Sequence, residues 1–242
     1  MVQLGSNSPK DVLDDLSLKT VRRRARTIQL LDAAERAGIT PISAARFHAF
    51  AYLADVLSPV WNLLPFDGKI LKIEGGPHYP ELQDELDRLV VLGLVEIKNL
   101  RYVDRAHEGA RIDGIYALRF DSQHLQNILS FLGLRKGSEA FDPNDLDIQA
   151  FLVELAGALA TVPDDEIDVA ATVDATYADK RIATSNIVDF ASWTEEPHDA
   201  NLSARVTERF KSFLPQGALL SPGEKIYVYA SYLSRRIHGK RA

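Results

Sequence analysis

The sequence predicts a mainly α-helical protein with a small β wing: a winged helix-turn-helix domain followed by a C-terminal helical domain. Two observations predict the wing. Residues 79–93 have leucines at helical spacing, and a short apolar strand follows them. A second strand is expected at residues 114–120, after a polar segment. A third observation predicts the helical second part: residues 122–242 carry further apolar stripes at helical spacing.

The first domain is expected to span residues 19–138, after a flexible arm at residues 1–18. A helix is expected to begin near Lys19 and to end at Gly38. Ser43 suits the N-cap of a second, strongly apolar helix that extends to Ser58.

Between the second and third helices the sequence predicts a loop, a strand at residues 70–73 and a turn at residues 75–77. Pro80 suits the first turn of the third helix, where a missing N–H costs nothing. Gly93 is expected to end that helix. Residues 102–113 are polar and are expected to form the tip of the wing.

The second domain is expected to span residues 139–242, behind a linker at residues 139–145. Residues 122–137 are expected to form a helix before that linker. Residues 167–193 are ambiguous, and helix, turn and helix is the favoured interpretation. The remaining helices are expected at residues 146–162, 201–215 and 222–241.

Composition limits the classes of protein that the chain can belong to. The 242 residues include no cysteine, which excludes disulfides and thiolate metal sites and suits a cytoplasmic protein. No run approaches the roughly 20 apolar residues of a membrane span, and the N-terminus lacks the features of a signal peptide. We therefore expect no membrane partner.

Charge is distributed unevenly along the chain. The net charge of −6 combines a nearly neutral segment at residues 1–138, a strongly acidic one at 139–199 and a basic one at 200–242. This asymmetry indicates contacts of more than one kind, or an acidic middle that packs on the basic tail within one molecule.

Arginines near the start of the first helix and in the wing are candidates for contacts with DNA phosphates. The dense cluster wraps more than half of the helix circumference, so the alternative is a solvated helix start or pairing with acids elsewhere in the molecule. The candidates are Arg22, Arg23, Arg24, Arg26, Arg101, Arg105 and Arg111.

The third helix has an acidic outer face, which argues against direct base reading because phosphates would repel it. Glu81, Asp84 and Glu85, with Arg88, are candidates for binding a protein partner. The alternative is a solvated face with an Asp84–Arg88 ion pair.

In the last helix an apolar stripe is expected to face inward, so that the tyrosines and arginines face other directions. Tyr227, Tyr232, Arg235 and Arg236 are candidates for a second partner site, because these residue types often dominate interfaces. The alternative is that the tyrosines complete the core with their hydroxyls at the surface.

No constellation indicates an enzyme. The phosphate-binding GxxxxGK[ST] and GxGxxG motifs, paired histidine ligands and GxSxG are all missing from the sequence. Asp67-Gly68-Lys69 has the acid-x-lysine spacing of a nuclease but lies in a turn. We therefore expect no catalytic residues, no metal and no cofactor.

A resemblance to a known family covers about a quarter of the chain. Residues 51–97 contain SPVW, DGKILK, GGPHYP and a final LDRLVVLGLV. This pattern resembles the middle component of bacterial ABC-three-component systems, which are Lamassu-like anti-phage and anti-plasmid systems. The resemblance implies a non-catalytic adaptor that bridges an SMC- or Rad50-like ATPase and an effector, often a nuclease. The alternative function is a DNA-binding transcriptional regulator.

Overall fold

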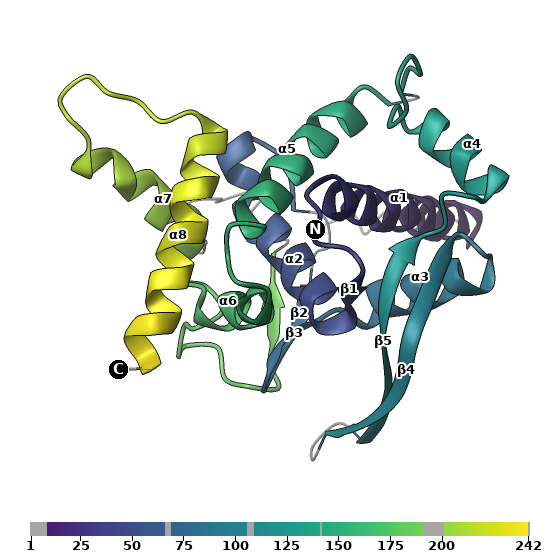
Figure 1. The fold of residues 1–242 in the computed structure, drawn as a ribbon, viewed down its shortest axis with the longest axis horizontal. Coiled ribbons are helices and arrows are strands. Elements are labelled where there is room, and N and C mark those ends of the chain that lie inside the picture. Colours follow the sequence, from purple (N-terminus) through teal and green to yellow (C-terminus); the bar gives the residue numbers. More distant parts are fainter. Residues whose placement is uncertain (1–8, 66–68, 106–108, 141, 191–200, 242) are drawn as a thin grey trace, which may run out of the picture.

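The computed structural model describes residues 9–65, 69–105, 109–140, 142–190 and 201–241 (Figure 1). Helices dominate the fold and a small antiparallel sheet accompanies them, as the sequence predicts, but the structure also contains a second small antiparallel sheet. The α-helices are α1 (Pro9–Arg36), α2 (Ala44–Leu57), α3 (Pro80–Val91), α4 (Gln123–Phe131), α5 (Asn144–Leu159), α6 (Ile167–Val173), α7 (Leu202–Arg209) and α8 (Pro222–Arg241).

Shorter elements connect these helices. The strands are β1 (Ile42–Ser43), β2 (Lys69–Ile73), β3 (Gly76–His78), β4 (Val95–Arg105), β5 (Gly109–Leu118) and β6 (Ile187–Asp189). The 3-10 helices are η1 (Ser58–Trp61), η2 (Asp164–Glu166) and η4 (Phe210–Phe213).

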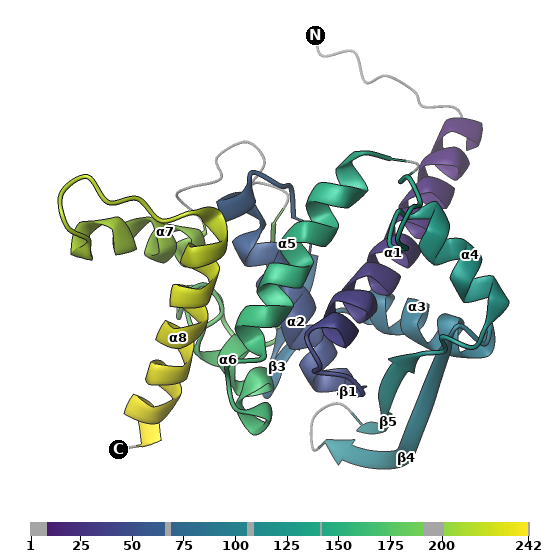
Figure 2. The same ribbon diagram turned by 45° about the horizontal axis from the view of Figure 1, so that its top comes forward.

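Helix α2 lies at the centre of the molecule, between α1, α5 and α6 (Figure 2). It carries apolar side chains on every side, and all of its residues except Ala45 and Arg46 are buried. Such a helix must be surrounded by other elements, because no face of it suits water. Ser43 caps it as predicted, since its hydroxyl accepts a hydrogen bond from the Arg46 N–H.

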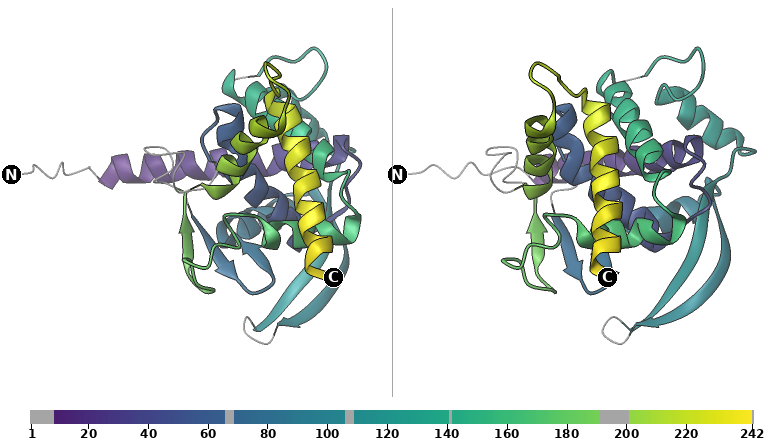
Figure 3. Two further views of the ribbon diagram at one scale, coloured as in Figure 1. Left: turned by 90° about the vertical axis from the view of Figure 1, so that its left-hand side faces the viewer. Right: turned by 60° about the vertical axis from the view of Figure 1, so that its left-hand side comes forward.

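Helix α1 is longer than expected. It begins at Pro9, so residues 9–18 of the predicted flexible arm are helical, while residues 1–8 lie outside the described part. Proline is accepted in the first turn of a helix, so Pro9 starts α1 where the prediction took it as a breaker. The N-terminal turns of α1 project away from the body of the protein (Figure 3).

The hairpin of β4 and β5 is also longer than predicted. Residues 102–113 were expected to form a polar tip, but pairing continues to Arg105 and Gly109. The ladder is held by backbone groups, so it does not need apolar side chains to continue. A bulge between Lys98 and Arg101 interrupts the register.

The third strand of this sheet is β1, which pairs with β5 to give the order β1-β5-β4. The predicted strand at residues 70–73 belongs instead to a second sheet, of order β3-β2-β6. Gly76 and Pro77, expected in a turn, pair with β2. Residues 187–189, favoured as helix, form β6, which buries only Val188.

The predicted domain boundary at residue 139 does not separate two cores. Helix α1 packs on α5, α2 packs on α6, and β2 pairs with β6. The buried apolar residues on both sides of the boundary form one cluster. The predicted linker at residues 139–145 runs into α5, which starts at Asn144.

Candidate functional site

Two of the clustered arginines are engaged within the molecule. The Arg24 Nε donates to Glu85 Oε1 of α3 at 2.5 Å. Arg26 is partly buried and donates to Gln29 Oε1 at 3.2 Å. Burial lowers the pKa of Arg26 to about 10, against the opposing effect of the nearby carboxylates Asp145 and Asp55. These two arginines therefore serve the fold, which is the alternative left open for the cluster.

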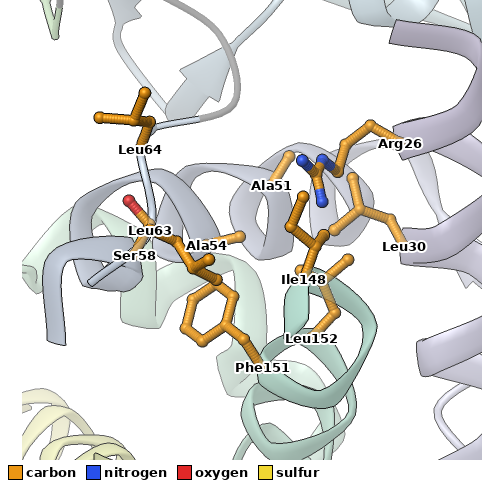
Figure 4. A pocket seen from close by; sticks show the side chains of 10 residues that line it. All are labelled: Arg26, Leu30, Ala51, Ala54, Ser58, Leu63, Leu64, Ile148, Phe151 and Leu152. Atoms are coloured by element: carbon orange, nitrogen blue, oxygen red, sulfur yellow. The ribbon is translucent and has the colours of Figure 1, made fainter. Parts of the chain in front are cut away.

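Arg26 lines a small cavity between α1, α2 and α5 (Figure 4). Leu30, Ala51, Ile148 and Leu152 surround its side chain. The cavity volume is about 20 Å³, which holds one water molecule and no larger ligand. This cavity is therefore not a substrate site.

The expected acidic face of α3 divides into a buried part and an exposed part. Glu85 is buried, and its Oε2 accepts from Arg88 Nη1 at 3.2 Å. It is therefore not a docking residue, and Arg88 pairs with Glu85 rather than with Asp84. Glu81 and Asp84 are exposed, together with their neighbour Asp87.

This division has a consequence for surface charge. Glu85 neutralises Arg24 from the adjacent helix α1, because the two side chains meet beneath the surface. The exposed charged residues of α3 are then three acids, Glu81, Asp84 and Asp87, and one base, Arg88, which pairs with Glu85. Such a surface repels phosphates and attracts a basic partner.

The basic candidates that stay exposed are fewer than predicted. Arg22 at the start of the cluster and Arg101 at the bulge of β4 are exposed, and Arg23 is partly buried. Arg105 and Arg111 lie in the β4–β5 hairpin, but their side chains fall outside the described residues. Exposed Tyr102 follows Arg101 on the same strand.

The candidates on α8 border a groove. Its volume is about 530 Å³, and its lining includes Tyr227, Tyr232 and Arg235. Arg236 lies outside the lining, where its guanidinium donates to the Tyr232 hydroxyl at 3.2 Å. Phe213, from η4, forms part of the opposite wall. Three of the four residues predicted on this helix are thus brought together.

A buried carboxylate, Asp174, was missed by the sequence analysis. It accepts hydrogen bonds from the hydroxyls of Tyr52 and Tyr229, each at 2.5 Å, and from Ser203 at 2.7 Å. The backbone N–H groups of Thr176 and Tyr177 also donate to it. These partners connect α2, α7 and α8 around the end of α6.

The tyrosines beside Asp174 are held in their protonated form. Burial raises the pKa of Tyr52 and of Tyr229 well above the ordinary value, and the charge of Asp174 raises both further. All three side chains are enclosed by protein. The cluster is therefore a structural joint and not an exposed reactive site.

Other polar groups of α2, from side chains and from the backbone, also connect this helix to its neighbours. Asp55 accepts from the Tyr79 hydroxyl at 2.6 Å, and the Asn201 side chain donates to the Val56 carbonyl at 2.6 Å. His48 contacts Gln83 Oε1 through Nε2 at 3.0 Å. The signal in the sequence was the set of polar residues spaced by three and four within an apolar helix.

Comparisons with known proteins identify no relative. Searches with protein-family models, of characterised proteins and of solved structures find no match. Within the described ranges, no three His, Asp or Glu side chains are grouped as a metal site requires. No helix in the described part of the chain has the length and apolar character needed to cross a membrane.

Proposed function

We propose that the protein is a non-catalytic winged-helix adaptor in a cytoplasmic defence complex, where it bridges an SMC- or Rad50-like ATPase and an effector. The order α1, β1, α2, α3 and the β4–β5 hairpin supports the winged-helix assignment, in which η1, β2 and β3 are an insertion between α2 and α3. The sheet order β1-β5-β4 also fits this assignment. In this interpretation α3 occupies the position from which a DNA-reading protein would contact bases.

The observation that carries the adaptor proposal is the acidic exposed surface of α3. Glu81, Asp84 and Asp87 are exposed, while the nearby Arg24 is paired with buried Glu85. A base-reading helix presents cations and neutral donors to the groove. This helix presents three carboxylates against one exposed arginine, Arg88, and this acidic excess favours a protein partner with a basic surface.

The test is co-expression with an SMC- or Rad50-like ATPase encoded beside the gene, followed by measurement of the affinity of the purified subunits. Glu81→Lys with Asp84→Lys should weaken assembly by at least about tenfold, because like charges then meet across the interface. The matched control is Glu74→Lys with Glu139→Lys, which changes the same charge at exposed sites elsewhere.

The proposal fails if the α3 variant assembles as tightly as the unchanged protein. Sequence-dependent DNA binding at nanomolar affinity in about 150 mM salt, by the chain alone, would support a transcriptional regulator instead.

A further inference from the structure

Helix α8 leaves one outward stripe after its apolar side is buried. The buried side chains are Ile226, Tyr229, Ala230, Leu233 and Ile237. The exposed residues on the opposite side recur at alternating spacings of four and three, so they form one stripe along the helix. They are Glu224, Val228, Ser231, Arg235 and His238.

The surface beside this stripe is apolar and open. The groove along α8 is lined by Phe213, which is 84% exposed, and by Leu220. Leu219, next to that lining, is 88% exposed. Helix α8 is uncovered along its length in the right view of Figure 3. A contiguous apolar surface of this kind indicates association with another protein surface.

The stripe is complementary to itself when reversed. If two copies of α8 run antiparallel with Ser231 at the crossing point, Glu224 faces His238 of the other copy. Within its own chain Glu224 also accepts from the Ser221 N–H, and His238 Nε2 lies 3.6 Å from Glu166. Val228 then meets the aliphatic stem of the other copy's Arg235. The acidic start of each helix thus lies beside the basic end of the other, and the helix dipoles are opposed favourably. A parallel pair would instead place Arg235 beside Arg235.

Close approach is possible at the centre of this arrangement. Ser231 is small and exposed, so two backbones can cross there without displacing large side chains. From these features we propose that the α8 groove is occupied by α8 of a second copy of this chain, in an antiparallel two-fold dimer. Such a contact uses the same patch on both subunits and closes on itself.

The dimer can be tested with the purified chain alone, which separates it from the adaptor proposal. Because the protein contains no cysteine, a single Ser231→Cys variant carries one thiol, close to the proposed two-fold axis. Oxidised glutathione should convert most of this variant to a disulfide-linked dimer. The matched control, Ser130→Cys on exposed α4, should remain largely monomeric.

Charge reversal tests the antiparallel register. Arg235→Glu and Glu224→Arg, each alone, place like charges at neighbouring positions of the two helices. Each should raise the dissociation constant in sedimentation equilibrium by at least about tenfold. The double variant restores opposite charges and should recover most of the affinity. Unfolding midpoints of the single variants check that the subunit itself remains folded.

Three outcomes would overturn the dimer: a chain that stays monomeric at every concentration, equal cross-linking of both cysteine variants, or a double variant no tighter than the single ones. Binding of a different protein in the groove of a monomeric chain would also count against it.

Discussion

Two buried carboxylates in this protein are satisfied in opposite ways. Among the residues that the structure describes, Asp174 receives only neutral donors, from tyrosine and serine hydroxyls and from backbone N–H groups. Glu85 receives two guanidinium groups, those of Arg24 and Arg88. Both carboxylates are buried, but the arginine side chains remain 33% and 53% exposed.

The difference shows what each site contributes. Asp174 is fixed in the interior by groups from three helices, so its hydrogen bonds stabilise the tertiary fold. Glu85 lies just below the surface, where water screens its partners and weakens each ion pair. Its main effect is on surface charge, because its carboxylate pairs with the partly exposed Arg24 and neutralises that cation. A buried acid can therefore either connect helices in the interior or determine the charge of the outer surface.

The largest expected effect comes from removing the interior carboxylate. Asp174→Ala leaves several buried donors without an acceptor, and the free energy of unfolding should fall by about 4 kcal/mol. Urea unfolding followed by circular dichroism measures this. The control Asp189→Ala removes an exposed carboxylate that pairs with Lys69, and it should cost less than about 1 kcal/mol. Similar losses in the two variants would contradict the comparison.

Alkaline pH should weaken the Asp174 joint but not the Glu85 site. Unfolded tyrosines ionise near pH 10, whereas Tyr52 and Tyr229 have raised pKa values in the folded protein. Below about pH 10, the two tyrosines make their full contribution to the free energy of unfolding. Above it, stability falls by about 2.7 kcal/mol per pH unit while both remain protonated in the fold.

Tyr229→Phe sharpens this test, because Tyr52 is then the only tyrosine of the pair whose pKa is raised in the folded protein. The slope of unfolding free energy against pH should fall to about half of its original value above pH 10. An unchanged slope would mean that the alkaline sensitivity arises elsewhere in the protein.

The Glu85 site should respond less strongly. Glu85→Gln replaces a charged acceptor by a neutral one, and we expect a loss of about 1 to 2 kcal/mol in unfolding free energy. About half of the loss should disappear in high salt, since Arg24 and Arg88 are accessible to ions. Salt should leave the loss in Asp174→Ala almost unchanged, and a salt-sensitive Asp174→Ala would break the distinction.

The smallest expected effects concern DNA. We expect weak binding at most, through exposed arginines that release counterions. Arg22→Ala with Arg101→Ala should reduce the slope of log affinity against log salt by about 2. Arg24→Ala should change it little, because Arg24 is paired with Glu85. Fluorescence anisotropy with a labelled duplex measures all three proteins, and equal losses would show that Glu85 does not withhold Arg24.

Local sequence signals determined the helices with clear ends. Ser43 caps α2, Pro80 opens α3, and α8 starts at Pro222, all as predicted. Gly93, after α3, has a positive φ of 68°. Caps and turn residues act within a few positions of the chain, so their effect is contained in a short stretch of sequence.

Only the tertiary structure decided which distant residues meet. Glu85 and Arg24 are 61 positions apart, and Asp174 and Tyr52 are 122 positions apart. Strand β6 is short, and its pairing depends on β2, which lies more than a hundred residues earlier. The sequence does not show whether a given acid will meet solvent, an arginine or a tyrosine hydroxyl. The packing of the helices around α2 determines its partner, because a buried carboxylate must be hydrogen-bonded or paired with a cation.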